Sequence, residues 1–227
     1  PAWERESAPF ADDDAGLVVL LKVSGTMQAA DVQPSRLARA KHKLRDLLQA
    51  REGLSTGLIV YSGSAHLVMP LTRDGRIVSA MVEDLTPELM PADGDSLREA
   101  LQLADSVLVR AGVPGSVLVM ADAVSPAQAE DIAAAMSSLP VQFLATTAPA
   151  GAVDAGLARA ASVLGAPVLR LSVDETDVQR VAQRAQSDFK AVAGVASGDR
   201  WRDAGYLLLQ LIALLALFWS RRGWLVR

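Results

Sequence analysis

The 227-residue sequence contains no cysteine, and only 4% of its residues are aromatic. The absence of cysteine excludes a disulfide framework, thiolate chemistry and a cysteine-based zinc site. The formal charge of −4 and the lack of a basic stripe argue against a nucleic-acid-binding surface, which needs cations to neutralise phosphates. Because 51% of the residues are hydrophobic, the core must consist mainly of alanine, valine and leucine, which is typical of parallel sheets covered by helices.

Sequence motifs for catalysis are also missing. Neither the dinucleotide-binding pattern G-x-G-x-x-G nor the phosphate-binding loop G-x-x-x-x-G-K-[ST] occurs. Ser24 does not lie in a G-x-S-x-G motif, and the two histidines, His42 and His66, fall on a predicted helix and on a predicted edge strand. We therefore predict that the protein is not an enzyme.

Short apolar stretches alternate with amphipathic stretches along most of the chain. The run LVVLL at residues 17–21 predicts a buried central strand, and a short strand near residues 66–69 follows its predecessor too closely for a crossover, which predicts an antiparallel hairpin. The order predicts an α/β fold, a doubly wound, mostly parallel, Rossmann-like sheet with one antiparallel edge strand. Further strands are predicted at residues 56–61, 117–120, 141–145 and 168–171, and helices from residue 34 and at 73–82, 97–111, 127–136, 154–164 and 175–192.

The C-terminal region differs from the rest of the chain. Residues 204–219 carry no formal charge, and arginines follow at positions 221, 222 and 227. This pattern predicts one C-terminal transmembrane helix at residues 204–220, and a buried core helix or a surface-bound amphipathic helix is the alternative. The positive-inside rule then places the tail in the cytoplasm and the folded domain on the periplasmic side of a bacterial inner membrane.

The predicted organisation is a polar lead at 1–14, a domain at 15–192, a hinge at 193–203, the membrane helix at 204–220 and a cytoplasmic tail at 221–227. Because the sequence begins at Pro1 and not at methionine, an upstream segment is also expected.

Ligands of a doubly wound sheet gather beyond the carboxyl ends of the strands, where the strand order reverses. Here these are the loops after Leu21, Gly94 and Met120. The first of them, KVSGTM at residues 22–27, together with DVQPSRLARAK at 31–41, resembles the opening of von Willebrand factor A (VWA) domains, specifically of the membrane-bound Bat (aerotolerance) family. The resemblance continues through residues 57–63, 70–74, 90–91 and 118–122 to the Arg-Arg-Gly-Trp sequence at 221–224.

The resemblance implies a VWA fold with a metal-ion-dependent adhesion site (MIDAS). In such a site an aspartate, two hydroxyls, a further serine or threonine and a second aspartate hold a divalent cation. The corresponding positions here are Lys22, Ser24, Thr26, Asp95 and Asp122. Ser24, Thr26 and Asp122 keep the expected oxygen atoms, whereas Lys22 replaces the first aspartate and Asp95 replaces the second-loop hydroxyl.

The lysine admits three interpretations. In the first, Lys22 is an internal cation between Asp95 and Asp122, so that no cofactor is expected and Mg²⁺ binding is weak or absent. In the second, Lys22 turns outward and a rearranged Mg²⁺ site forms from Ser24, Thr26, Asp95 and Asp122. In the third, these are loop residues without a ligand role. The basic cluster Arg36, Arg39, Lys41, Lys43 and Arg45 is interpreted as a solvated helix face.

The resemblance also implies the kind of partner. It points to a membrane-anchored protein-interaction module that acts as a scaffold in an envelope complex, with other membrane or envelope proteins, Bat-type proteins and a MoxR-type AAA+ ATPase as partners. The alternative from another class is an accessory subunit of a membrane transport or channel assembly. Co-purification from membranes separates the two, because an ATPase or Bat-type protein supports the first and a multi-span pore subunit supports the second.

Overall fold

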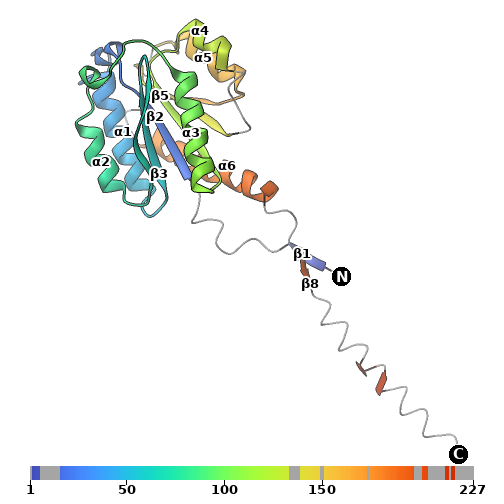
Figure 1. The fold of residues 1–227 in the computed structure, drawn as a ribbon. Coiled ribbons are helices and arrows are strands. Elements are labelled where there is room, and N and C mark those ends of the chain that lie inside the picture. The colour runs from blue at the N-terminus through green and yellow to red at the C-terminus, as the bar shows by residue number, and fades with distance from the viewer. Residues whose placement is uncertain are drawn as a thin grey trace, which may run out of the picture. The chain divides into compact units, whose positions relative to one another are not determined.

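The larger part of the chain forms one compact unit, residues 10–193, and residues 1–9 and 194–227 form a second, smaller unit. In this computed structural model the described residues are 2–5, 16–132, 139–148, 151–172, 174–196, 201–203, 213–214 and 216–217. Within the larger unit, helices cover both faces of a central sheet (Figure 1).

The central sheet has six strands in the order β4-β3-β2-β5-β6-β7. The edge strand β4 runs antiparallel to β3, and all the other neighbours are parallel. The predicted doubly wound α/β fold, mostly parallel with one antiparallel edge strand, is therefore confirmed. The strands are β2 (Gly16–Lys22), β3 (Thr56–Tyr61), β4 (Ala65–Thr72), β5 (Gly115–Ala121), β6 (Val141–Ala145) and β7 (Val168–Arg170).

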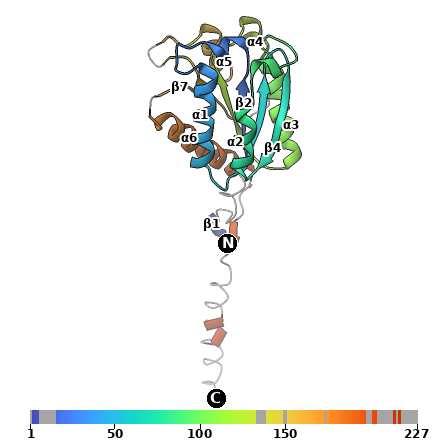
Figure 2. The ribbon, with the colours of Figure 1, turned by 90° about the vertical axis from the view of Figure 1, so that its left-hand side faces the viewer.

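Each face of the sheet packs against its own set of helices, so every residue of β2 and β5 is buried. Val19 and Leu21 of β2 belong to the core on one side, where α1 (Arg36–Ala50), α2 (Gly75–Glu83) and α6 (Thr176–Ala196) pack. Val18 and Leu20 belong to the core on the other side, which α3 (Leu97–Ala111), α4 (Pro126–Asp131) and α5 (Ala155–Val163) cover. Figure 2 shows α1 and α3 on opposite sides of the sheet. Burial on both faces explains why the strand sequences are continuously apolar.

The basic cluster on α1 is not a uniformly solvated face, which corrects the interpretation from sequence. Lys43 is only 4% exposed, donates to Asp177 Oδ1 over 2.7 Å and also donates to the carbonyl of Asp174. Position 43 falls on the apolar stripe of the helix, between Ala40 and Leu47. Periodicity cannot reveal that a carboxylate at the start of α6 neutralises a lysine on that stripe, because the partner lies far away in sequence.

The smaller unit contains a strand pair that the sequence pattern does not indicate. Strand β1 (Ala2–Arg5) pairs antiparallel with β8 (Trp201–Asp203), in segments predicted as a polar lead and a hinge. Strands of four and three residues are too short to show an alternating pattern, and their partners lie at opposite ends of the chain.

The predicted membrane helix at residues 204–220 and the tail at 221–227 lie largely outside the described residues. Only Ala213, Leu214, Ala216 and Leu217 of this region are described, and they are helical. Leu214 and Leu217 are 68% and 70% exposed. Within the described ranges, no helix has the length and apolar character needed to cross a membrane.

Candidate functional site

The candidate site lies beyond the carboxyl ends of β2 and β5, the two central strands. The chain passes from β2 to β3 on one side and later returns to β5 on the other side, so the strand order reverses between β2 and β5. Three loops meet there: the 3-10 helix η1 (Gly25–Gln28) after β2, residues 122–125 after β5, and residues 93–96 before α3. This is the place where doubly wound sheets bind ligands.

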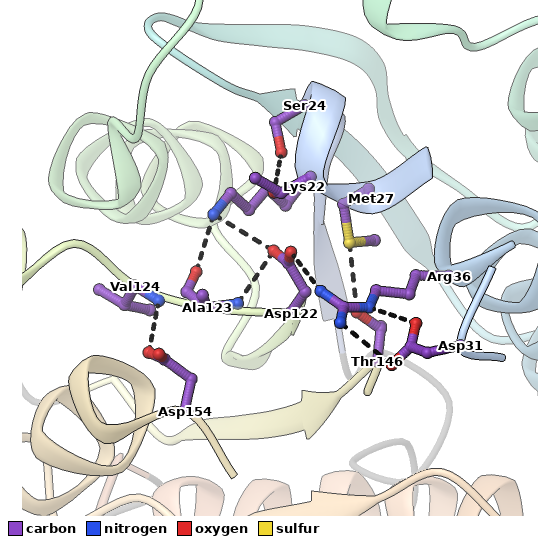
Figure 3. A network of polar contacts seen from close by, with 11 residues as sticks. Lys22, Ser24, Met27, Asp31, Arg36, Asp122, Ala123, Val124, Thr146 and Asp154 are labelled. Atoms are coloured by element: carbon purple, nitrogen blue, oxygen red, sulfur yellow. Dashed lines mark hydrogen bonds and ion pairs between the residues drawn. The ribbon is translucent and has the colours of Figure 1, made fainter. Parts of the chain in front are cut away.

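Lys22 is the last residue of β2, and its side chain points into the site (Figure 3). Its Nζ donates to the carbonyl of Ala123 over 2.8 Å and lies 3.3 Å from Asp122 Oδ1. The Lys22 and Asp122 side chains are 6% and 1% exposed, so this ion pair is buried. The lysine therefore acts as a cation that joins the end of β2 to the loop after β5.

Arg36, the first residue of α1, supplies a second cation to the same carboxylate. Its Nη1 donates to Asp122 Oδ2 over 3.0 Å, while Nε and Nη2 donate to the two carboxylate oxygens of Asp31 over 2.7 and 3.0 Å. Each oxygen of Asp122 thus faces a different cation. The hydrogen bonds from Arg36 are the main reason why the pKa of Asp31 is lowered from its ordinary value.

Ser24 and Thr26 bring their hydroxyls together in the first loop. The two oxygen atoms lie 2.9 Å apart, and Ser24 is buried whereas Thr26 is exposed. The turn is held by the amide of Met27, which donates to the carbonyl of Ser24, and by the buried Met27 side chain, whose sulfur accepts a hydrogen bond from Thr146. The hydroxyl pair therefore sits on a fixed turn at the rim of the site.

Asp95 lies in the site but does not pair directly with Lys22. Its Oδ2 accepts a hydrogen bond from the amide of Ser125 over 2.6 Å, and among the described residues its buried Oδ1 has no hydrogen-bond partner within normal geometry. Burial raises the pKa of Asp95, and the nearby charge of Lys22 opposes that shift. Lys22 thus contacts Asp122 directly and acts on Asp95 through its charge, while the amide of Ser125 donates the hydrogen bond to Asp95.

Two glycines allow the loop that carries Asp95 to approach the sheet. A Cβ atom at Gly63 would lie 2.5 Å from the carbonyl oxygen of Asp93, which is closer than real Cβ contacts allow. Gly94 has φ +146°, a conformation that L side chains rarely adopt. Because both positions are glycine, the amide of Ser96 reaches the carbonyl of Ser62 over 2.6 Å, and Asp95 is fixed next to the loop after β5.

The loop after β5 is held from the far side by Asp154. Its Oδ1 accepts from the amide of Val124 over 3.1 Å and from the amide of Leu157, in the first turn of α5, over 2.9 Å. Sequence reasoning missed Asp154, Asp31 and Arg36 as parts of the site. The position of Arg36 and Asp154 in the chain could have indicated their role. Both residues stand at the start of helices that follow strands, and such helix starts lie at the same edge of the sheet as the site.

The residues that correspond to a MIDAS do not fit a divalent cation in this arrangement. Both Asp122 oxygens face cationic side chains, one of them the Lys22 ammonium, and the hydroxyls of Ser24 and Thr26 bond to each other. An Mg²⁺ ion about 4 Å from that ammonium would meet repulsion on the order of several kcal/mol at an effective dielectric of about 20. The outward orientation of Lys22, which the rearranged metal site requires, is not the orientation in the structure. Among the described residues, no group of three or more histidine, cysteine, aspartate or glutamate side chains is arranged to hold a metal ion.

Comparison with known sequences gives a family match and several relatives. Residues 17–125 match the family model of the von Willebrand factor type A domain. A UPF0353 protein of Mycolicibacterium paratuberculosis is 30% identical over 159 residues, which cover 70% of this chain and 44% of the relative. A UPF0353 protein of Mycobacterium tuberculosis is 25% identical over 249 residues, with 92% of this chain and 70% of the relative covered. The chain thus spans less than half the length of the first of these relatives.

Solved structures show the same fold. BatB from Bacteroides thetaiotaomicron superposes with a TM-score of 0.64 at 21% identity, covering 78% of this chain and 99% of that protein. An aerotolerance-related membrane protein from Bacteroides fragilis gives a TM-score of 0.61 at 21% identity and the same coverage. At this identity the likeness concerns the fold alone.

Proposed function

From the match of residues 17–125 to the family model of the von Willebrand factor type A domain, we propose that the chain is a membrane-anchored protein-interaction module of this family and not an enzyme. Its binding face is the edge of the sheet beyond β2 and β5, where Lys22 and Arg36 take the place of a divalent cation. In this proposal the site has lost metal dependence and keeps its architecture through internal ion pairs.

The contact between Lys22 and Asp122 carries the proposal. A buried carboxylate needs a counter-charge, and the lysine ammonium with its three donors supplies it. Unlike a metal ion, the lysine side chain cannot dissociate from the protein. A metal-dependent site gains or loses its charge with the metal concentration, whereas this site is neutralised permanently. Partner binding at this face is therefore independent of divalent cations.

The partner is an envelope protein. The sequence resemblance is the support for a scaffold role in a complex with Bat-type proteins and a MoxR-type AAA+ ATPase, and the shared fold with BatB and with an aerotolerance-related membrane protein is compatible with it. The anchor is the apolar stretch at 204–220, with the domain in the periplasm. The exposed Leu214 and Leu217 support this, because exposed leucines one turn apart favour an apolar surrounding over water.

Calorimetric titration with Mg²⁺ and Mn²⁺ tests the state of the site. We expect no affinity in the micromolar range for the unmodified chain, and a gain in affinity for Lys22→Asp combined with Asp95→Thr, which restores the usual ligands. Adding Arg36→Gln should raise the affinity further, because it frees the second oxygen of Asp122. Micromolar binding by the unmodified chain would refute the proposal of a metal-independent site.

Site-specific photo-crosslinking tests the binding face. A photoreactive amino acid replaces Thr26, at the exposed rim, and in a matched control it replaces Glu52, which is exposed and follows the end of α1 at the opposite edge of the sheet. In native membranes with a chelator present, we expect an adduct with a Bat-type protein or a MoxR-type ATPase from position 26 and not from position 52. An adduct that forms only when Mg²⁺ is added contradicts the proposal.

Two further measurements test the anchor. Removal of residues 204–227 should release the chain from membranes that retain the full chain during flotation. For the orientation, Val109 is 71% exposed and the chain has no cysteine, so Val109→Cys gives a single labelling site. Labelling by a membrane-impermeant thiol reagent only after the inner membrane is permeabilised would place the domain in the cytoplasm and overturn the orientation.

A further inference from the structure

Strands β1 and β8 join two segments that lie far apart in the sequence. Their antiparallel register pairs Ala2 with Asp203, Glu4 with Arg202 and Arg5 with Trp201. Figure 1 shows the two strands side by side. The pairing places the N-terminal strand beside the last residues before the apolar stretch, which begins at residue 204.

This strand pair is too small to be stable in water without help. An isolated two-stranded sheet is marginal even when a tight turn connects its strands, and here no short turn connects them. The ladder has only three residue pairs and a register shift between Ala2 and Glu4. An environment that competes less than water for the backbone hydrogen bonds must therefore stabilise the strand pair.

The amino-acid composition of the two strands indicates which environment this is. Two of the four tryptophans of the chain, Trp3 and Trp201, fall within these seven residues. The remaining positions of the two strands are mostly charged residues. Tryptophan between charged residues, immediately before an apolar stretch, is typical of the interfacial layer of a bilayer.

We propose that β1 and β8 form a juxtamembrane clasp, Ala2–Arg5 with Trp201–Asp203, which binds the headgroup layer of the lipid bilayer. The inference rests on the membrane anchor of the proposed function. The clasp fixes the N-terminal strand at the point where the chain enters the membrane. The segment before the anchor is then a structured contact with lipid and not a free hinge.

Paired cysteines in the full chain test the strand pairing. Glu4→Cys with Arg202→Cys lies in register, whereas the control pair, Glu4→Cys with Ala196→Cys, places the second cysteine before β8 and outside the apolar stretch. In vesicles of phosphatidylcholine and phosphatidylglycerol, we expect the in-register pair to form a disulfide at least about ten-fold faster than the control, because pairing raises the effective concentration of the two thiols. Equal rates for the two pairs would overturn the clasp.

Fluorescence quenching tests the contact with lipid. A nitrobenzoxadiazole dye is attached to Glu4→Cys or, as a control, to Thr26→Cys at the rim of the domain. Lipids spin-labelled at the headgroup should quench the dye at position 4 several-fold more than the dye at position 26, and more than lipids labelled deep in the acyl chain do. Equal quenching at positions 4 and 26 overturns the inference. Flotation of the same samples distinguishes a failure of the clasp from a failure of the membrane anchor. A chain that floats with the vesicles but shows no selective quenching at position 4 keeps its anchor and lacks the clasp. A chain that does not float has no anchor.

Discussion

Arg36 and Asp122 lie 86 positions apart in the sequence, and Arg36 Nη1 donates to Asp122 Oδ2 over 3.0 Å. Lys22 occupies the other oxygen of the same carboxylate, 3.3 Å from Oδ1. One buried acid thus joins the start of α1, the end of β2 and the loop after β5. Because the charge of Asp122 is shared by two cations, losing either cation should weaken the site without leaving the carboxylate unpaired.

Replacing Lys22 tests this shared arrangement. Removing one partner of a fully buried ion pair costs about 3 to 5 kcal/mol, and because Arg36 remains beside Asp122 we expect Lys22→Met to lower the free energy of unfolding by about 2 kcal/mol. Urea denaturation of Lys22→Met, Asp122→Asn and the double variant gives a complete cycle. The double loss should be smaller than the sum of the single losses by about 1 kcal/mol. Strictly additive losses would show that the ion pair contributes nothing.

Replacing Arg36 should change the titration of Asp31. The hydrogen bonds from Arg36 lower the pKa of Asp31, so their contribution to stability is present above the ordinary pKa of 3.8 and is lost as the pH falls through the folded-state value. In Arg36→Gln the pKa of Asp31 should rise toward its ordinary value, as measured by NMR titration of the carboxyl carbon. Arg39→Gln is a matched control on the same helix and should leave Asp31 unchanged. A low pKa that persists in Arg36→Gln would mean that backbone amides, and not the guanidinium, hold the carboxylate.

Lys43 makes a second buried ion pair, with Asp177, and it joins α1 to α6. The side chains are 4% and 2% exposed, so Lys43→Met leaves a buried carboxylate without its cation and should cost about 3 to 5 kcal/mol in chemical denaturation. Lys41→Met is the control, because Lys41 donates to the carbonyl of Glu83 at the surface, and it should cost less than about 1 kcal/mol. Similar losses in both variants would contradict a structural role for the buried pair.

The fold could be predicted from sequence because its strands are short and apolar on both faces. The predicted limits of β3, α3 and β6 coincide with the observed ones, and the antiparallel edge strand follows from the short link after Tyr61. Local pattern and chain connectivity determine these features. The pair of β1 and β8 could not be predicted in this way, because it depends on an interaction between two segments that lie far apart in the sequence.

The site could be predicted only in part. The resemblance located Lys22, Ser24, Thr26, Asp95 and Asp122, and the structure places them in three neighbouring loops. Which carboxylate the Lys22 ammonium contacts depends on differences of a few ångströms in the positions of the loops and on backbone amides that compete for the same carboxylates. Neither can be predicted from the local sequence. The role of Arg36 was missed because a basic residue on an amphipathic helix is usually solvated, and only the packing of α1 against the sheet edge turns it toward Asp122.

Asp95 is expected to change the stability of the protein with pH in the direction opposite to that of Asp31. Its pKa is raised above the ordinary value of 3.8, mainly by burial, while the charge of Lys22 and the amide of Ser125 oppose the shift and the charge of Asp122 adds to it. An acid with a raised pKa binds more protons in the folded state than in the unfolded state, so the stability of the protein falls as the pH rises from 3.8 through the folded-state value.

The variant Asp95→Asn removes this dependence and leaves the geometry nearly unchanged. The amide oxygen of asparagine accepts the same hydrogen bond from Ser125, and no charge is buried. Denaturation midpoints across the acidic range should therefore show the variant gaining stability relative to the parent as the pH rises from 3.8, with a constant difference once Asp95 is fully ionised. Asp93→Asn is the control, because Asp93 is exposed two residues away. If the parent instead gains on Asp95→Asn as the pH rises, the ionised form of Asp95 is the one that the site stabilises, and the charge of Lys22 must then outweigh the effect of burial on Asp95.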